Sequence, residues 1–323
     1  MFPIRDTIQS RTVPVVNNLI IGVNILVFLV QLSLGTGASQ FVTHYGLTPA
    51  RYTVPEIAAY FSLSQQAFSF FSYMFLHGGF LHLLGNMWML YIFGDNVEDR
   101  LGHFRYLAFF LACGVLAGAA HMVSAPYSKL PTVGASGAIA GVMGAYFLLH
   151  PRAKVLTLIP IIIIPFFVEI PAFFFLGFWF VMQFLNAAGS ASGGIAWWAH
   201  VGGFIFGMIL VRLIPMAPQI GADRMVRSVT KRRRSPRLQV LRPSGAPAVA
   251  DMTATLFVTP TEARLGAKKI VNIPWGYEKR LFTVVVPPGV RPGTKLRLKG
   301  LGKSGPGGER GDIYLEVALT REA

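Results

Sequence analysis

Six apolar runs in the first two thirds of the chain are long enough to cross a lipid bilayer, and they constrain the fold more than any other feature. A hydrocarbon core of roughly 30 Å takes about 20 apolar residues in a helix. Residues 1–218 hold only 9 of the 29 Lys and Arg and 6 of the 14 Asp and Glu. The sequence therefore predicts an α-helical polytopic membrane domain with six transmembrane helices, near residues 18–34, 75–93, 104–123, 135–149, 171–185 and 197–214.

The positions of Lys and Arg predict the orientation of this domain, because cytoplasmic loops carry an excess of these residues. With a cytoplasmic N-terminus, the outer loops receive only Arg51 and Lys129. We therefore expect an integral, multi-pass membrane protein with both termini in the cytoplasm. Segment 154–167 is apolar but contains Pro160 and Pro165, so we expect it to be interfacial or re-entrant. The fifth helix should begin near residue 171, since proline is tolerated in a first helical turn.

A serine and a histidine lie inside apolar runs, where groups able to act as nucleophile and base are costly and indicate function. Run 135–149 is only about 15 residues long, roughly 22 Å as a helix, so we expect Ser136 at a helix N-terminus below the outer surface. Such an end offers unpaired N–H groups and a partial positive charge, which stabilise an oxyanion. His200 lies about one turn inside the sixth run, so both side chains are expected at comparable depth.

Further residues fit the same interpretation. Small-xxx-small patterns on both runs allow two helices to pack closely. Their glycines are Gly137, Gly141, Gly203 and Gly207. His82 and Asn86 are four residues apart, so they share one helix face and can direct donors into one cavity. Asn86 alone fits a hydrogen bond between helices equally well.

The remaining polar residues give no sign of a metal site. Cys113, the one cysteine, lies in an apolar run, so neither a disulfide framework nor a cysteine-based zinc site is available. The histidines have no metal-ligand spacing such as His-Glu-x-x-His, and we expect His77 and His121 near helix ends, at the membrane interface. We predict neither a metal nor an organic cofactor.

Three motifs, in this order, resemble the signatures of the rhomboid intramembrane serine proteases. They are His82-x-x-x-Asn86 preceded by Phe-Leu-His-Gly at 75–78, Gly-Ala-Ser-Gly at 134–137, and Ala-His at 199–200 with following glycines. The resemblance covers roughly residues 15–215. It implies that Ser136 is the nucleophile and His200 the general base of a dyad without an acidic third member. It also implies an oxyanion hole formed by His82, Asn86 and the backbone N–H of Ser136.

Two other features of the sequence bear on this resemblance. Glu98, Gly102 and Arg105 resemble the family's Glu-x-x-x-Gly-x-x-Arg pattern, for which we expect a structural role. Some members have an aromatic residue four positions after the nucleophile, where it stacks under the histidine. This chain has Ala140 there, so another group must hold the histidine.

The resemblance implies an intramembrane serine endopeptidase of the bacterial inner membrane. It would cleave transmembrane-helix substrates near the outer membrane face, with entry between the second and fifth helices. Its partners would be transmembrane protein substrates and membrane lipid. The alternative is a non-proteolytic rhomboid-like protein that binds membrane proteins as a chaperone adaptor, but the presence of Ser136 and His200 favours the protease. A transporter is disfavoured because no charged residue lies at mid-membrane.

The character of the chain changes after residue 215. Residues 216–250 are rich in Pro, Ala, Ser and Arg, with Lys-Arg-Arg-Arg at 231–234, and predict a disordered basic linker that can rest on anionic lipid. We predict no nucleic-acid partner. The expected domains are a six-helix membrane domain at 1–215, the linker at 216–250 and a β-domain at 251–323.

The last part of the chain predicts a small cytoplasmic all-β domain, because β-type runs alternate with glycine and proline turns. The runs are 253–259, 269–273, 281–286, 295–299 and 313–318. Segments 286–290, 293–302 and 311–317 resemble the C-terminal β-domain of DnaJ-type co-chaperones, which binds unfolded peptide. No J-domain His-Pro-Asp motif and no cysteine-rich zinc module is present, so recruitment of a partner chaperone is not implied. An unfolded peptide or protein partner and a passive regulatory role both stay open.

Overall fold

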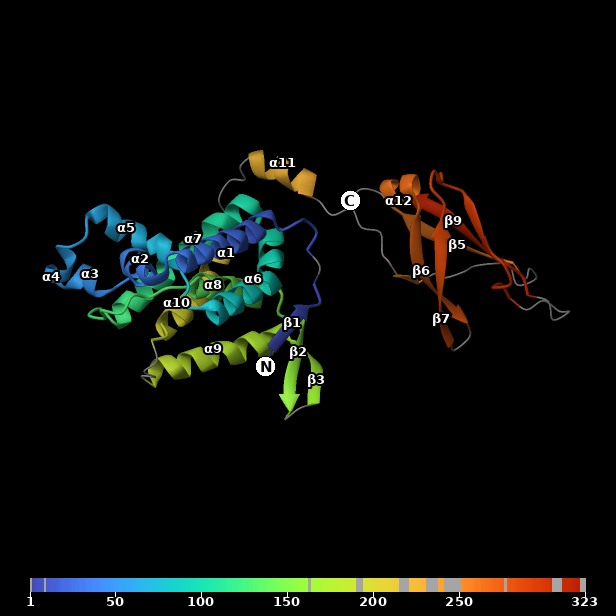
Figure 1. Ribbon diagram of the computed structural model, residues 1–323. Helices are drawn as coiled ribbons and strands as arrows, with labels where there is room; N and C mark the ends of the chain where they lie inside the picture. Colours follow the sequence, from blue (N-terminus) through green and yellow to red (C-terminus); the bar gives the residue numbers. More distant parts are fainter. Residues whose placement is uncertain are drawn as a thin grey trace. The chain divides into compact units, whose positions relative to one another are not determined.

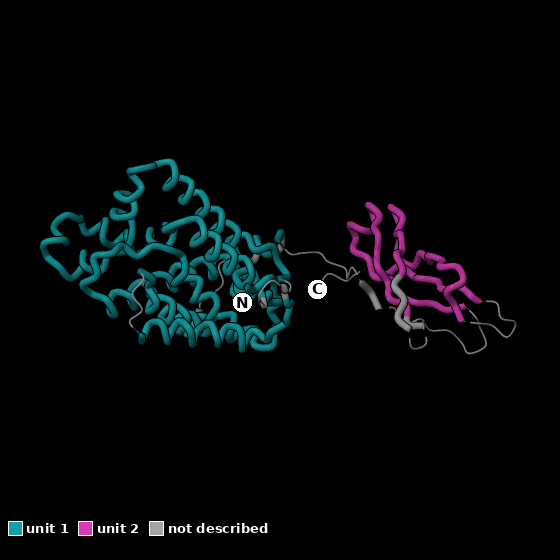
Figure 2. The backbone as a smooth tube through the Cα atoms, turned by 60° about the horizontal axis from the view of Figure 1, so that its bottom comes forward, with its two compact units in different colours: residues 1–232 teal, residues 233–323 magenta. Residues whose placement is uncertain are grey.

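Two compact units follow one another along the chain, residues 1–232 and residues 233–323 (Figure 2). The computed structural model describes residues 2–8, 10–161, 164–189, 194–214, 221–230, 238–240, 251–275, 278–303 and 310–319. The first unit is mostly helical and the second mostly β-sheet (Figure 1). Each contains a buried apolar cluster, so each has a core of its own.

The first unit carries helices on all six apolar runs. Its elements are β1 (Phe2–Asp6), α1 (Val15–Ser33), η1 (Gly35–Gly37), α2 (Ala38–Tyr45), α3 (Ala50–Thr53), α4 (Pro55–Ala58), α5 (Leu63–Ser72), η2 (Tyr73–Phe75), α6 (Phe80–Leu101), α7 (His103–Ser124), α8 (Ser136–Leu149), β2 (Lys154–Ile161), β3 (Ile164–Pro171), α9 (Ala172–Ala188), α10 (Trp197–Leu213) and α11 (Gly221–Thr230).

The lengths of these helices differ. Among the described residues, α1 and α7 are each long and apolar enough to cross a membrane. The stretch from α5 through η2 joins α6 at a bend of 79° to form a further apolar pair, whereas α8, α9 and α10 are apolar but shorter. Six spans therefore stay a prediction.

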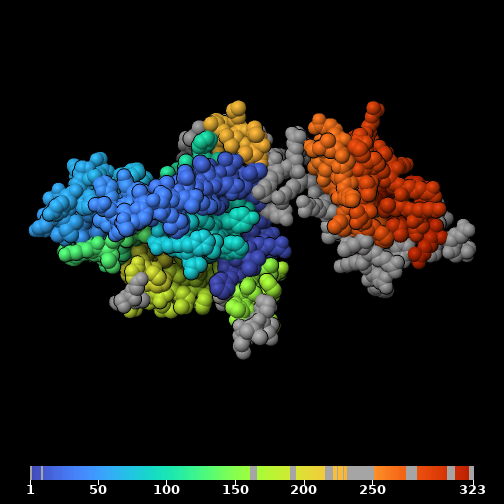
Figure 3. Space-filling view, viewed as in Figure 1, coloured from blue at the N-terminus to red at the C-terminus, as the bar shows by residue number. Residues whose placement is uncertain are grey.

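Helix α1 presents an apolar surface to the outside of the unit, across the face seen in Figure 3. Leu19, Leu26 and Leu32 are each about 60% exposed. The opposite side of the helix is buried, including Ile20 and Phe28. Exposed leucines in a row are costly in water but favourable against lipid tails, so this face is suited to contact with the bilayer.

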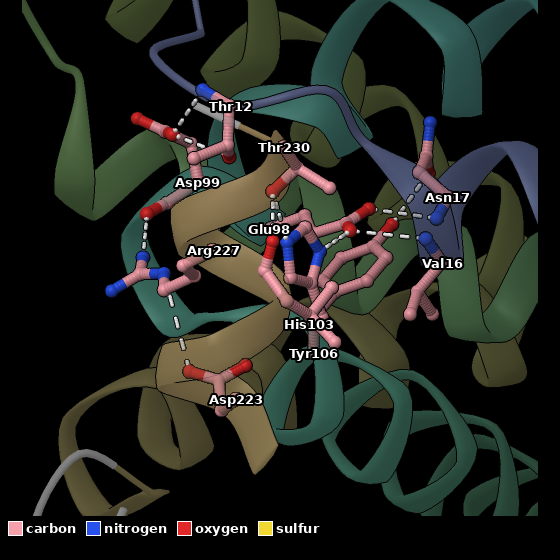
Figure 4. A network of polar contacts seen from close by, with 11 residues as sticks. Thr12, Val16, Asn17, Glu98, Asp99, His103, Tyr106, Asp223, Arg227 and Thr230 are labelled. Carbon is pink, nitrogen blue, oxygen red and sulfur yellow. Dashed lines mark hydrogen bonds and ion pairs between the residues drawn. The ribbon is translucent and has the colours of Figure 1, made fainter. Parts of the chain in front are cut away.

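A buried carboxylate ties α1 to the corner between α6 and α7 (Figure 4). Glu98 is 1% exposed, and its oxygens accept hydrogen bonds from the N–H groups of Val16 and Asn17 at 3.0 and 2.7 Å. Donors in the first turn of a helix have no partner within the helix. His103 contacts the same carboxylate, and Gly102 has a φ of 94°, which favours glycine. Glu98 and Gly102 thus have contacts that fit the structural role expected of them.

Helix α11 packs against the same corner (Figure 4). The hydroxyl of Thr230 lies 3.0 Å from Nε2 of His103. The guanidinium of Arg227 donates a hydrogen bond to the backbone oxygen of Asp99. This helix lies in segment 216–250, for which the sequence predicts a disordered linker. The polar side chains of α11 therefore have partners elsewhere in the first unit. The composition of the segment does not indicate these contacts.

Strands β1, β2 and β3 form an antiparallel sheet in that order. The sequence predicts an interfacial or re-entrant segment at 154–167, and the chain forms a hairpin there. Pro160 lies opposite Pro165 in this strand pair. Helix α9 begins at Ala172 directly after Pro171, which confirms the predicted start of the fifth helix.

The second unit contains two three-stranded sheets, in the orders β4-β6-β7 and β5-β9-β8. The bounds are β4 (Leu238–Val240), β5 (Met252–Val258), α12 (Pro260–Leu265), β6 (Ala267–Trp275), β7 (Glu278–Val286), β8 (Lys295–Leu298) and β9 (Ile313–Leu319). All five predicted strands are confirmed, with β6 and β7 longer than predicted. Between residues 216 and 250 the structure describes α11 and β4, and the rest of the predicted linker, including 231–234, lies outside the described residues.

The two sheets enclose a small apolar core. Leu256 on β5 and Leu315 on β9 are fully buried, and these two strands run parallel. Helix α12 follows β5 and begins with a capping box, in which Thr259 and Glu262 each accept a hydrogen bond from the other's backbone N–H. Antiparallel pairs join β6 to β7 and β8 to β9.

Candidate active site

Helix α8 begins at Ser136 and is buried from Gly137 to Tyr146, so it lies at the centre of the first unit. Gly134, just before the helix, has a φ of 125°, which favours glycine. A Cβ atom at Gly134 would also lie 2.8 Å from two ring atoms of His82. Glycine therefore allows both the turn into α8 and the close approach of α6. As predicted, Ser136 lies where first-turn N–H groups lack helical partners.

The serine and histidine singled out in the sequence meet in the structure. Oγ of Ser136 lies 2.8 Å from Nε2 of His200, which is the fourth residue of α10. Both side chains are partly buried. This distance suits a hydrogen bond, and it is the geometry in which a histidine can take a proton from a serine hydroxyl.

Glycine pairs bring the two helices together. A Cβ atom added at Gly203 would lie 2.1 Å from the backbone oxygen of Gly137, and one at Gly207 would lie 2.0 Å from that of Gly141. Any side chain at these positions would overlap the opposite backbone. The close packing predicted from the small-xxx-small patterns is confirmed, and it sets the distance between Ser136 and His200.

A residue that the sequence analysis missed holds the other side of the histidine ring. Nδ1 of His200 lies 2.8 Å from Oε1 of Gln183 on α9, whose side chain is 8% exposed. Trp179 and Trp197 have ring centroids 6.1 and 5.9 Å from that of His200. Ala140 is fully buried and offers no ring for stacking. The sequence did contain a signal for Gln183, because it is a polar residue within an apolar helix.

The second predicted pair lies on α6 beside the serine. His82 and Asn86 line the same cavity as Ser136 and His200. Nδ1 of His82 accepts a 3.4 Å hydrogen bond from the N–H of Gly78. The site therefore contains every residue that the sequence analysis assigned to it.

His77 lies between η2 and α6, near a helix end as expected, and its side chain contacts other residues of the unit. It is 2% exposed, and its Nε2 lies 2.9 Å from Nδ2 of Asn86. Gln31 on α1 fixes its backbone through two hydrogen bonds, at 3.0 and 3.1 Å. An amide carries two N–H donors, so a bond from Asn86 to His77 leaves one donor of Asn86 for a ligand. His77 thus holds Asn86 in place.

The site opens into a cavity of about 800 Å³. Its wall is formed by α6, α8, α9 and α10, together with the segment before α8 and the first residues of β1. Met89 of α6 and Phe175 and Trp179 of α9 give it an apolar lining. A cavity of this size is large enough to hold a ligand against Ser136 and His200.

The part of the chain that the structure describes offers no cluster of metal ligands beside this cavity. Among those residues, no group of three or more His, Cys, Asp or Glu side chains is placed to hold a metal ion. Cys113 is a free, buried thiol on α7. The chemistry that the arrangement offers is that of a serine, an imidazole and amide donors.

Comparison with known proteins extends this picture. Residues 64–216 match the Rhomboid domain family, and residues 251–323 match the DnaJ C terminal domain family. Rhomboid protein 1, mitochondrial, of Saccharomyces cerevisiae is 30% identical over 200 residues, 59% of this chain and 50% of the relative. The rhomboid protease GluP of Bacillus subtilis is 34% identical over 154 residues, 46% of this chain and 26% of the relative. A DnaJ-like protein of Synechocystis sp. is 40% identical over 75 residues, 23% of this chain and 21% of the relative.

The chain spans half or less of the length of these curated relatives. The Rhomboid match contains all four candidate site residues, and rhomboid domains are membrane-embedded, in agreement with the apolar helices of the first unit. The chain therefore contains a region that matches the Rhomboid domain, followed by a region that matches the DnaJ C terminal domain.

Proposed function

We propose that the protein is an intramembrane serine endopeptidase in which Ser136 and His200 form the catalytic dyad. The observation that carries the proposal is the 2.8 Å contact between Oγ of Ser136 and Nε2 of His200, at the start of a central helix and on the wall of a cavity. Serine hydroxyls are weak nucleophiles unless an adjacent base takes the proton. Among the described residues, His200 is the base in direct contact with Ser136.

The reaction follows from these positions. As Oγ of Ser136 attacks the scissile carbonyl carbon, Nε2 of His200 takes the hydroxyl proton, and the carbonyl oxygen becomes an oxyanion. The imidazolium then gives its proton to the leaving amine, and an acyl-enzyme remains. Water from the cavity loses a proton to His200 as it attacks the ester. His200 then gives this proton to Oγ of Ser136 as the ester bond breaks, and the second product is released with its carboxylate.

We assign three donors to the oxyanion hole. They are the backbone N–H of Ser136, the second amide N–H of Asn86 and the ring of His82. The N–H of Ser136 belongs to a helix N-terminus, whose partial positive charge adds to the effect. His82 and Asn86 line the cavity on the side of α6.

The proposed substrates are transmembrane helices of other proteins, which enter the cavity between α6 and α9. Both helices contribute apolar side chains to its wall, including Met89 and Trp179. Ser136 begins a helix of 14 residues, roughly 21 Å long. If α8 ends at the cytoplasmic surface, the reacting groups lie below the outer membrane face, where a substrate helix must unwind. The distribution of Lys and Arg supports cytoplasmic N- and C-termini, and we place the protein in a bacterial inner membrane.

For the second unit we propose weak binding of extended, unfolded peptide. The match to the DnaJ C terminal domain supports this role. Exposed apolar residues on its strands, namely Phe257, Ile270 and Val285, are suited to contact with peptide side chains. Strand-type pairing is the expected mode. Residues 233–323 alone should bind a Leu- and Phe-rich peptide in a fluorescence titration, and an absence of binding at millimolar peptide would contradict the role.

The endopeptidase is tested by incubating the purified full chain in detergent with a single-span substrate. Wild-type protein should cleave it, while Ser136→Ala and His200→Ala should not. Members of one catalytic unit are non-additive, so the double variant should be no worse than either single one. Retained cleavage by Ser136→Ala would refute the mechanism. Substrate that binds to wild-type protein but is never cut would instead favour the non-proteolytic adaptor.

A further inference from the structure

Gln183 contacts the edge of the His200 ring that is turned away from Ser136. Its Oε1 lies 2.8 Å from Nδ1 of His200, whose Nε2 lies 2.8 Å from Oγ of Ser136. The three side chains come from α9, α10 and α8, so three helices must be in register to align them. Gln183 is 8% exposed, so the contact lies largely inside the protein.

The chemistry of an amide oxygen makes this contact directional. A carbonyl oxygen accepts hydrogen bonds and cannot donate them. The proton of the neutral imidazole must therefore be on Nδ1, which leaves the lone pair of Nε2 facing the serine hydroxyl. A general base at Nε2 needs this tautomer, and the group bonded to the other nitrogen selects it.

We propose that Gln183 is the positioning residue of His200 and substitutes for both an acidic third member and a stacked aromatic ring. The inference rests on the proposed serine endopeptidase function. Gln183 fixes the tautomer and the rotation of the ring, and it accepts the Nδ1–H bond of the imidazolium that forms when Ser136 attacks. Unlike a carboxylate, it does this without a buried charge, which is costly inside a membrane.

The test compares variants at this position by their labelling with a small fluorophosphonate, which reports the nucleophilicity of Ser136 without docking of a substrate helix. Gln183→Leu removes the acceptor at similar volume, and Gln183→Glu keeps an acceptor in the same place. Asn186→Leu is the matched control, because Asn186 lies on the same helix and, among the described residues, its amide has its hydrogen bond with the backbone oxygen of Met182 in that helix.

Gln183→Leu should lower both kcat for cleavage and the labelling rate by about tenfold to a hundredfold, the scale for residues that orient a functional histidine. KM should stay within a factor of about two, because the contact that is lost in this proposal is the one with His200 and not one with the substrate. Gln183→Glu should restore much of the rate. Asn186→Leu should match wild type in every measurement.

The pH profile of labelling separates positioning from a purely structural role. Loss of an acceptor disfavours the imidazolium, so Gln183→Leu should move the acidic limb to lower pH, whereas an ionised Gln183→Glu should move it to higher pH. Among the described residues, His82 on α6 and His121 on α7 are the titratable groups that interact electrostatically with His200. Both histidines are present in every variant, so a difference between the pH profiles arises from the side chain at position 183.

The outcomes separate this inference from the proposed function. If wild-type protein is labelled at Ser136 but Gln183→Leu reacts at the wild-type rate with an unmoved profile, the positioning role is wrong and the protease stands. If cleavage falls while labelling does not, Gln183 contacts substrate instead, which also overturns the inference. If Gln183→Leu fails to fold, the test uses Gln183→Glu. A pH profile of labelling whose acidic limb is the same in Gln183→Glu as in wild type would then refute the positioning role. Wild-type protein that is never labelled at Ser136 would remove the proposed function itself.

Discussion

A single methyl group at Gly207 should weaken the site although it lies two turns of α10 away from the histidine. A Cβ atom there would be 2.0 Å from the backbone oxygen of Gly141 and 2.5 Å from its Cα atom. The shortest ordinary contact between carbon and a carbonyl oxygen is about 3.3 Å. Helices α8 and α10 must therefore separate by on the order of 1 Å in Gly207→Ala, because neither backbone can rotate away as a side chain can.

Both stability and rate should respond to that separation. Overpacking of a close-packed interior typically costs about 1–3 kcal/mol. The Ser136–His200 contact bridges the same two helices, and a misplacement of about 1 Å in a reacting pair can cost about a hundredfold in rate. We expect Gly207→Ala to unfold at a lower temperature in detergent and to cleave a single-span substrate about a hundredfold more slowly.

Gly22→Ala is the matched control for this substitution. Gly22 also lies within an apolar helix, α1, but a Cβ atom there would meet nothing within 4 Å. Alanine is favoured over glycine inside helices by about 0.5–1 kcal/mol, so this variant should be unchanged or slightly more stable and fully active. Wild-type activity and stability in Gly207→Ala would show that close helix packing does not set the geometry of the site.

Further predictions concern the oxyanion donors, the N-terminal strand and α11. Asn86→Ala should lower kcat by about a hundredfold, the scale of one lost oxyanion donor, with a small change in unfolding temperature; an unchanged kcat would assign Asn86 to helix packing. Burial raises the pKa of Asp6 from 3.8 to about 6, although its hydrogen bond from Tyr146 opposes the shift. The native state then binds more protons than the unfolded chain between these values, so wild-type protein should gain stability relative to Asp6→Asn from pH 7 to pH 5, and parallel melting curves would contradict this. A chain ending after Arg232 should keep wild-type activity and unfolding temperature, whereas one ending after Pro218 should still cleave but unfold earlier, because it lacks α11; equal unfolding temperatures would show that α11 adds no stability.

The candidate site could be predicted because its signals are local. Ser136 and His200 are polar groups within apolar runs, and the start of each run fixes their depth. Gly203 and Gly207 mark one helix face at a spacing that does not depend on the rest of the fold. The residues to which we assign the chemistry were therefore recognisable from the sequence.

The supporting residues could not be predicted, because their contacts depend on tertiary packing. The polarity of Gln183 is visible in the sequence, but its contact with His200 depends on how α9 rotates against α10. His77 lies near a helix end, as expected, yet α1 covers it and Gln31 holds it there.

Strand pairing and the extra helix were missed for the same reason. The sheet pairs Phe2 with Leu158, two positions far apart in sequence, and no local pattern specifies such a pair. Helix α11 has the composition of a linker, and its partners Asp99 and His103 lie on a distant corner. In the second unit the alternating strands were predicted correctly, whereas the parallel pairing of β5 with β9 was not.

Mass spectrometry of the fluorophosphonate adduct tests the central claim most directly. The purified full chain is treated with the reagent, digested and searched for the modified residue. The dyad predicts a single adduct on Ser136 in wild-type protein, none at that position in Ser136→Ala, and labelling slowed by about a thousandfold or more in His200→Ala, the scale of losing a member of a catalytic dyad. An adduct on another residue, or an adduct on Ser136 that forms equally fast without His200, would contradict the account.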